Sequence, residues 1–263
     1  CAQDSSIPKS SPIQSEKSPK INRDSTINNL QQMIDTLLES GKTTKALYKL
    51  ILLTEEYGHR ANYAKSYETA WKALSIADSS DNEVVRSHIH RRIGAMYSFS
   101  KRKEEAIKHL RISLDIMKKL VEQKKMKPYH LVNSYYTFCY TYRGLNEPKI
   151  AKKYLDSCYL FNSPKQDQVK LSYLKFEESY VLREEKKYDE AIKVLQEIEP
   201  WFKENTPSYL VLVYAYWGLI HEQLNQPEKA ISYYQKAIAI SEKYQSHMDF
   251  KSYIHEKLAE NYK

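Results

Sequence analysis

Apolar and small residues recur along this chain at spacings of three, four and seven positions, which is the period of amphipathic helices. The clearest stretch runs from Val211 to Lys243. In it, Gly218 lies twelve residues before Ala230, and Tyr234 and Ala237 follow Ala230 by four and seven positions. A short polar break that contains proline separates the two halves. The pattern predicts two helices that cross at their small residues, where the backbones can approach closely.

The same internal intervals occur four more times upstream, more loosely in the first copy. One helix pair cannot bury both of its apolar faces, so neighbouring copies are expected. The first small residues of the second helices are Ser66, Ala106, Ala151, Ala191 and Ala230. They are 40, 45, 40 and 39 positions apart. These long intervals predict extended second helices or longer links, and the visible links are 162–164 and 200–207.

The pattern predicts an all-α fold of stacked helix pairs behind a polar tail. The tail has three prolines and no apolar period, so ordering it would cost entropy that no burial offsets. The expected parts are a disordered tether over 1–24, a capping helix over 25–40, repeats near 47–80, 87–125, 132–163, 172–205 and 211–245, and a partial repeat or cap over 249–263.

The repeats resemble the tetratricopeptide repeat (TPR) family. The resemblance is carried by Trp217 with Gly218, by Gly94 with Tyr97, and by the alanines at 106, 151, 191 and 230, and it covers about residues 47 to 263. It implies a right-handed superhelical solenoid of about five antiparallel helix pairs plus capping helices. It also implies that the first helices line a concave groove that binds peptides or other proteins.

The groove positions of that family fall here on basic and aromatic residues. They are Tyr48, His88, Arg91, Arg92, Asn133, Tyr136, Tyr140, Arg143, Tyr173, Phe176 and Tyr180. Guanidinium groups bind carboxylates bidentately, so an acidic peptide or a free C-terminal carboxylate is the expected ligand class. The sequence departs from the family's known carboxylate clamp, which needs lysine and asparagine at particular first-helix sites, because several of those sites are occupied by Ile51, Glu55, Ala95 and Tyr140. Packing between neighbouring repeats is the alternative role of the tyrosines.

Composition excludes some classes of function. The 5 glycines are widely spaced, so no glycine-rich phosphate loop can be written. The net charge of +8 favours acidic partners or anionic surfaces. Nucleic acid is the weaker expectation, because basic runs such as 101–103 fall at helix ends, where a solvated face is usual. No stretch reaches the roughly 18 apolar residues of a membrane span.

Candidate chemistry is sparse. His221 and His255 begin near matches to a zinc-hydrolase helix, but both matches lack the second histidine. His88 and His90 are two positions apart and therefore lie on different helix faces. We expect no metal, no cofactor and no enzyme. Cys139 and Cys158 occupy small-residue contact points and are expected as buried thiols, although their spacing leaves a disulfide open.

Cys1 and the Ser/Pro/Lys-rich residues after it resemble a mature bacterial lipoprotein, in which the signal peptide is removed at a lipid-bearing cysteine. The leading expectation is a lipid-anchored scaffold in the cell envelope, with Cys1 as the lipidation site. One alternative is the extracytoplasmic sensory TPR module of a membrane-anchored transcriptional regulator or histidine kinase. Another is a cytoplasmic peptide-responsive TPR regulator, if Cys1 is a truncation. The sequence predicts no oligomeric state.

Overall fold

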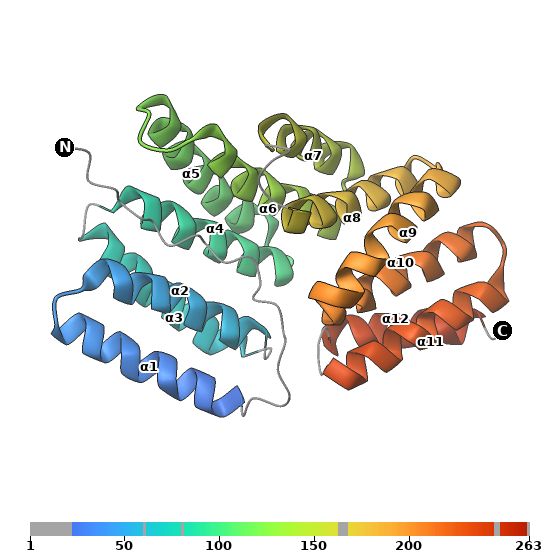
Figure 1. Ribbon diagram of the computed structural model, residues 1–263, viewed down its shortest axis with the longest axis horizontal. Coiled ribbons are helices and arrows are strands. Elements are labelled where there is room, and N and C mark those ends of the chain that lie inside the picture. Colours follow the sequence, from blue (N-terminus) through green and yellow to red (C-terminus); the bar gives the residue numbers. More distant parts are fainter. Residues whose placement is uncertain (1–22, 60–61, 80–81, 163–167, 245–247, 262–263) are drawn as a thin grey trace. The chain divides into compact units, whose positions relative to one another are not determined.

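Every element of the described residues is a helix, as the apolar period predicts (Figure 1). The computed structural model of the protein describes residues 23–59, 62–79, 82–162, 168–244 and 248–261. The α-helices are α1 (Arg23–Glu39), α2 (Thr43–His59), α3 (Tyr63–Asp78), α4 (Glu83–Phe99), α5 (Lys103–Glu122), α6 (Leu131–Gly144), α7 (Pro148–Phe161), α8 (Gln168–Glu184), α9 (Tyr188–Asn205), α10 (Leu210–Gln223), α11 (Pro227–Tyr244) and α12 (Met248–Asn261). Single 3₁₀ turns, Pro128–His130 and Pro207–Tyr209, precede α6 and α10. The predicted tether over 1–24 lies almost wholly outside the described residues.

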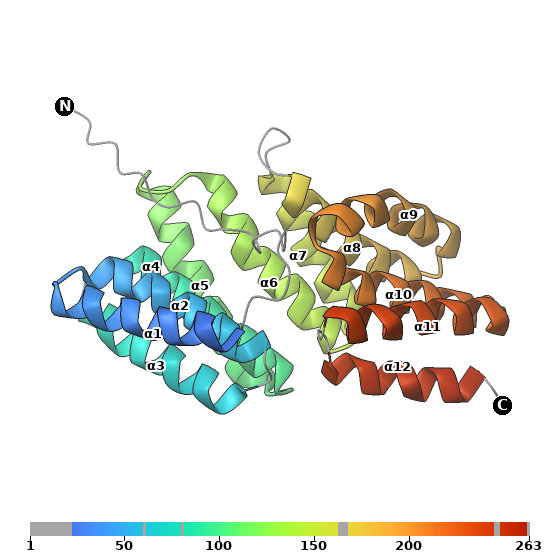
Figure 2. The ribbon, with the colours of Figure 1, turned by 60° about the horizontal axis from the view of Figure 1, so that its bottom comes forward.

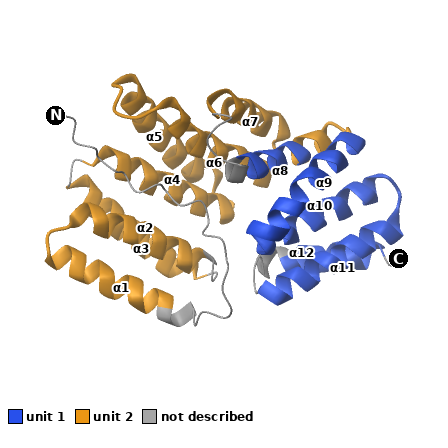
Figure 3. Cartoon of the chain, viewed as in Figure 1, with its two compact units in different colours: residues 1–18, 167–179, 188–263 blue, residues 19–166, 180–187 orange. Residues whose placement is uncertain are grey.

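The chain divides into two compact units (Figure 3). Among the described residues, unit 1 comprises those within 167–179 and 188–263, and unit 2 comprises those within 19–166 and 180–187. The sequence pattern alone treats 25–263 as one solenoid. The boundary between the units falls within α8, and each unit is described below by itself.

Unit 2 is a stack of helix hairpins. α2 packs on α3, α4 on α5 and α6 on α7, while the first helices α2, α4 and α6 also contact one another in that order (Figures 1 and 2). α1 lies against α2, and its Leu30 and Ile34 join the core that contains Leu50 and Ile89. The three first helices therefore form a continuous layer.

Unit 1 is built around the α10–α11 hairpin. Ala230, Tyr234 and Ala237 of α11 are fully buried, and Ile254 of α12 packs into the same cluster. α12 thus covers the last hairpin at the position where the sequence predicts a partial repeat or cap.

The twelve-residue interval of the sequence pattern is a direct contact between paired helices. In the first pair, the Ser66 hydroxyl donates to the Thr54 carbonyl across 2.8 Å. In the second, a Cβ on Gly94 would lie 3.0 Å from the carbonyl oxygen of Ala106. Small residues are required at these points because a larger side chain would separate the two backbones.

The turns of four hairpins, from α4–α5 to α10–α11, share one backbone conformation in spite of different sequences. Lys101, Asn146, Lys186 and Asn225 each have φ between 54° and 59°. The residue after each one donates its N–H to a carbonyl five positions earlier, as Gln226 does to His221 across 2.9 Å. This left-handed residue satisfies carbonyls at the helix end and reverses the chain.

The predicted link from Pro200 to Pro207 is wrong in its first part, because α9 continues through Pro200 to Asn205. A proline inside a helix removes one backbone hydrogen bond. The turn that follows is held by Phe202, which is fully buried and stacks on Tyr209 with ring centroids 4.7 Å apart. This burial offsets the lost hydrogen bond, and only the 3₁₀ turn at 207–209 connects α9 to α10.

Candidate functional site

The predicted site residues of unit 2 lie on its three first helices. Tyr48 comes from α2, and His88, Arg91 and Arg92 come from α4. The rings of Tyr48 and His88 meet edge to face, with centroids 6.4 Å apart. The remaining residues, Asn133, Tyr136, Tyr140 and Arg143, are all on α6 and all half-buried. The first-helix layer therefore carries the site, which we call the α2–α4–α6 face.

Two adjacent guanidinium groups occupy the middle of this face. The Arg92 guanidinium forms an ion pair with the Glu55 carboxylate of α2 across 3.0 Å. The Arg91 guanidinium donates to the Thr137 hydroxyl of α6 across 3.4 Å, and this hydroxyl donates to the Asn133 carbonyl across 2.9 Å. Arg91 has no ion pair with a carboxylate of the described residues. One of the two arginines is thus neutralised and the other is not.

The local charges favour an anion. The Nε atoms of Arg91 and Arg92 are both buried without a hydrogen-bond partner in the described structure. Burial, followed by the neighbouring charge of Arg92, lowers the pKa of Arg91. Burial, followed by the charges of Arg91 and His130, lowers the pKa of His88 to about 3. His88 is therefore neutral at neutral pH, and Arg91, Arg92 and Glu55 together leave one positive charge.

An aromatic edge adjoins the arginines. Tyr140 stacks on Phe99 with centroids 6.3 Å apart, and Tyr136 meets Tyr140 edge to face at 5.4 Å. Phe99 is the last residue of α4 and is 66% exposed, which is unusual for a phenylalanine. This edge offers apolar surface beside a charged centre.

In α8 the predicted residues are core residues. Tyr173, Phe176 and Tyr180 are 8%, 0% and 2% exposed. Phe176 packs against Tyr209 and Tyr216 with centroids 5.3 and 4.8 Å away, and Tyr173 packs on Phe202. Packing against other elements, the role left open in the sequence analysis, describes Tyr173 and Phe176, and Tyr180 is buried.

Glu55, Thr137 and Phe99 were not among the predicted site residues. A helical spacing was available for two of them, because Glu55 lies seven positions after Tyr48 and Thr137 four after Asn133, which places each pair on one helix face. No helical spacing relates Phe99 to the predicted site residues, because it is the last residue of its helix and lies outside the repeated apolar pattern. Its place beside Tyr140 follows from the packing of α4 on α6.

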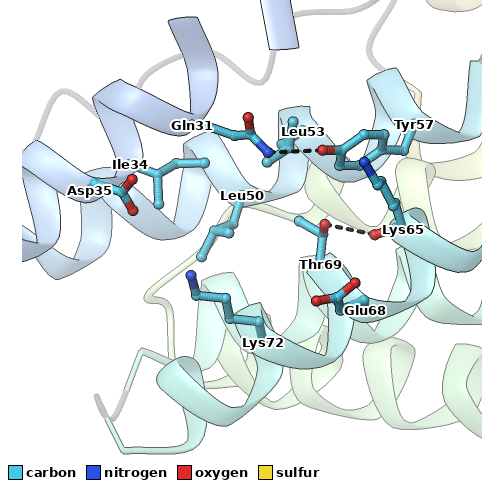
Figure 4. Close-up of a pocket in the computed structure, with 10 residues that line it drawn as sticks. All are labelled: Gln31, Ile34, Asp35, Leu50, Leu53, Tyr57, Lys65, Glu68, Thr69 and Lys72. Atoms are coloured by element: carbon cyan, nitrogen blue, oxygen red, sulfur yellow. Dashed lines mark hydrogen bonds between the residues drawn. The ribbon is translucent and has the colours of Figure 1, made fainter. Parts of the chain in front are cut away.

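A separate cavity of about 380 Å³ lies between α1, α2 and α3 (Figure 4). Leu50, Leu53 and Ile34 form part of its lining, and Gln31 donates to the Tyr57 hydroxyl across 3.0 Å at one side. Two lysines, one aspartate and one glutamate also line it, so their charges balance. Such a cavity does not select a charged ligand.

The remaining expectations concern thiols, metals and membranes. Cys139 and Cys158 are buried, and the Cys158 thiol donates to the Val132 carbonyl across 3.8 Å. Within the described ranges, no three His, Cys, Asp or Glu side chains are grouped so that they could hold a metal ion. Likewise, none of the described helices combines the length and the hydropathy of a membrane span. Cys1 lies outside the described residues.

Comparison with known proteins agrees with the hairpin architecture. A family model described as tetratricopeptide repeat matches residues 211–244, which is the α10–α11 hairpin. The chain therefore contains a tetratricopeptide repeat (TPR), and it is called the TPR protein below. No curated protein sequence matches it. The family match confirms the resemblance that the small-residue pattern carries. The all-α fold of TPR type is confirmed as well.

Solved structures with a similar fold have low sequence identity to the TPR protein. A chain of the APC/C hetero-tetramer Cut9-Hcn1 has a TM-score of 0.66 at 14% identity, over 91% of this chain and 40% of that one. BtubC from P. vanneervenii has a TM-score of 0.61 at 10% identity, over 86% and 93%. The apo form of RapI has a TM-score of 0.59 at 18% identity, over 85% and 78%. At these identities the likeness concerns the fold.

Proposed function

We propose that this TPR protein is a non-enzymatic scaffold that binds an acidic segment of a partner protein on the α2–α4–α6 face of unit 2. The TPR fold is in general that of a protein-interaction scaffold. One relative by fold is itself part of a hetero-tetramer. The observation that carries the proposal is Arg91, a largely enclosed cation with no carboxylate partner in the described structure. A buried cation of this kind is stabilised most by a ligand that supplies the missing anion.

Affinity capture tests the proposal. Wild-type protein and the double variant Arg91→Ala/Tyr140→Ala are used as bait in extracts of the source cells, and recovered proteins are quantified by mass spectrometry. Arginine and tyrosine anchors of interfaces typically contribute about 2 kcal/mol or more each, so recovery of the specific partner should fall at least about tenfold. Arg111→Ala, at an exposed arginine of α5, is the control for net charge.

The double variant should remain folded, because removing an uncompensated buried charge does not destabilise a helix pair in the way that breaking an ion pair does. Circular dichroism checks this before capture. Equal recovery of every partner by wild type and double variant would remove the α2–α4–α6 face from the proposal.

A lipid anchor at Cys1, which would place the protein at a membrane of the bacterial cell envelope, is the second part of the proposal. It is supported by the resemblance of Cys1 and the residues after it to a mature lipoprotein. Cells that express the natural gene are labelled with an alkyne analogue of palmitate, and the purified protein should carry the label. The Cys1→Ser variant should lose it completely. Unlabelled wild-type protein in a cell whose known lipoproteins are labelled would refute the anchor.

A further inference from the structure

The α2–α4–α6 face contains its own example of a bound carboxylate. Glu55 reaches from α2 to the Arg92 guanidinium, and the two side chains are 31% and 23% exposed. The neighbouring Arg91 has the same guanidinium chemistry but donates only to a neutral hydroxyl. The arginine pair is therefore half-occupied by an internal acidic side chain, and of the two guanidinium groups Arg91 is the one that remains for an external carboxylate.

The charge balance of the arginine pair leaves one positive charge for a ligand at this point of the face. Glu55 neutralises Arg92, and His88 is uncharged at neutral pH. A ligand with one carboxylate would neutralise the remaining positive charge. A second carboxylate that points to the face next to the first, two positions away along an extended segment, would approach Glu55 and would lose its own hydration without gaining a cation from the arginine pair. Glu55 therefore acts as a determinant of specificity as well as a partner of Arg92.

The aromatic edge defines what must lie next to the carboxylate. Thr137, which accepts from Arg91, lies three positions before Tyr140 on α6, a rise of about 4.5 Å along the helix. The Phe99 ring on Tyr140 extends the apolar surface further. In an extended peptide, side chains two positions apart point the same way and are about 7 Å apart. An apolar side chain two positions from the carboxylate would reach the ring pair.

We propose that the α2–α4–α6 face binds an extended segment of a partner protein in which one acidic side chain, held by Arg91, lies two positions from an apolar side chain held by Phe99 and Tyr140. Glu55 disfavours a second acidic side chain that points to the face beside the first. This inference rests on the proposed function, because it concerns the same face.

Synthetic peptides test this ligand class on the full chain. The probes are twelve-residue fluorescent Gly/Ser peptides, blocked at both ends, that carry Glu-Ser-Phe or Phe-Ser-Glu at the centre. Matched probes replace Glu by Gln, replace Phe by Ser, or carry a second Glu two positions from the first on the side away from Phe. One further probe has no Glu but a free C-terminal carboxylate. Dissociation constants are measured by fluorescence anisotropy. Wild type should bind one of the two Glu/Phe orders at least about tenfold more tightly than its Gln and Ser counterparts.

Single variants assign the parts of the site. Arg91→Gln should abolish the preference for Glu over Gln, whereas Arg111→Gln should retain it. Phe99→Ala, at an exposed position, should abolish the preference for Phe over Ser and provides a readout if Arg91→Gln fails to fold. Glu55→Gln should raise the affinity for the two-glutamate probe at least about fivefold.

Three results would overturn the inference. They are equal binding of the Glu and Gln probes by wild type, equal effects of Arg91→Gln and Arg111→Gln, and binding only of the probe with a free C-terminal carboxylate. These results are distinguishable from failure of the proposed function. If a natural partner is lost with Arg91→Ala/Tyr140→Ala while no probe binds, the face is confirmed and the ligand class is wrong.

Discussion

The Gly218→Ala variant is expected to unfold with a free energy about 2 kcal/mol lower than wild type. A Cβ atom at position 218 would lie 2.6 Å from Cδ1 and 2.8 Å from Cζ of Tyr234. The Tyr234 ring is fully buried in the α10–α11 core, so it cannot move aside without disturbing its neighbours. Overpacking of this kind costs about 1 to 3 kcal/mol or more, and it outweighs the roughly 1 kcal/mol that alanine gains over glycine in a helix. Urea unfolding followed by far-ultraviolet circular dichroism measures the difference.

Two other glycines supply the controls. Gly144, the last residue of α6, has no side-chain or distant backbone atom within 4 Å of an added Cβ, so Gly144→Ala should leave stability unchanged or slightly higher. At Gly94 an added Cβ would lie 2.7 Å from Cγ and Cδ2 of Leu110 and 3.0 Å from the Ala106 carbonyl oxygen, so alanine should lower stability there as well. If Gly218→Ala and Gly144→Ala unfold at the same urea concentration, the close contact between α10 and α11 does not restrict the size of the side chain at position 218.

Acidification from pH 6.5 to 4.5 is expected to destabilise unit 2 through His88 by as much as about 3 kcal/mol. The pKa of His88 in the folded protein is lowered to about 3, from 6.5. The unfolded chain therefore binds a proton below pH 6.5 that the folded protein does not bind until about pH 3. Stability consequently falls as the pH decreases through this window, by up to about 1.4 kcal/mol per pH unit. The groups that face His88 are Tyr48, Arg91 and His130, and none supplies a negative charge.

Replacing His88 by glutamine tests this pH dependence. Urea midpoints of wild type and His88→Gln are compared at pH 7.0 and 4.5, and the variant should lose clearly less stability on acidification. His255→Gln, at an exposed histidine of α12, controls for the loss of a histidine as such. His90 and His109, whose pKa values are also lowered by burial, should retain part of the acid sensitivity in the variant. An identical loss in wild type and His88→Gln would contradict the assignment.

The hairpins were predictable from sequence because their contacts are local and repeated. Ser66 contacts Thr54 across the first helix pair, and Ala230 lies in the same hairpin as Gly218. The two residues of each pair are twelve positions apart in the sequence. Helical geometry converts that separation into proximity whenever the turn between the helices is short. The turns were harder to predict from the sequence. Lys101 and Asn225 adopt the same left-handed conformation, although only asparagine is typical of it.

The site was only partly predictable. The spacing that placed Arg91 on the first-helix layer also placed Tyr173 and Phe176 there, but those two rings are packed against Phe202, Tyr209 and Tyr216. Periodicity identifies the face of a helix on which a residue lies. It does not show whether another segment covers that face, because the covering residues lie some 30 to 40 positions away.

The sequence alone therefore determined the helix pairs, the small residues at their crossings and the TPR family, since all three follow from local helical geometry repeated along the chain. Only the tertiary structure showed that Glu55 neutralises Arg92, that Arg91 lacks such a partner and that Phe99 lies exposed against Tyr140. Charge pairing and burial depend on the distances between side chains of α2, α4 and α6, and packing of the helices sets those distances.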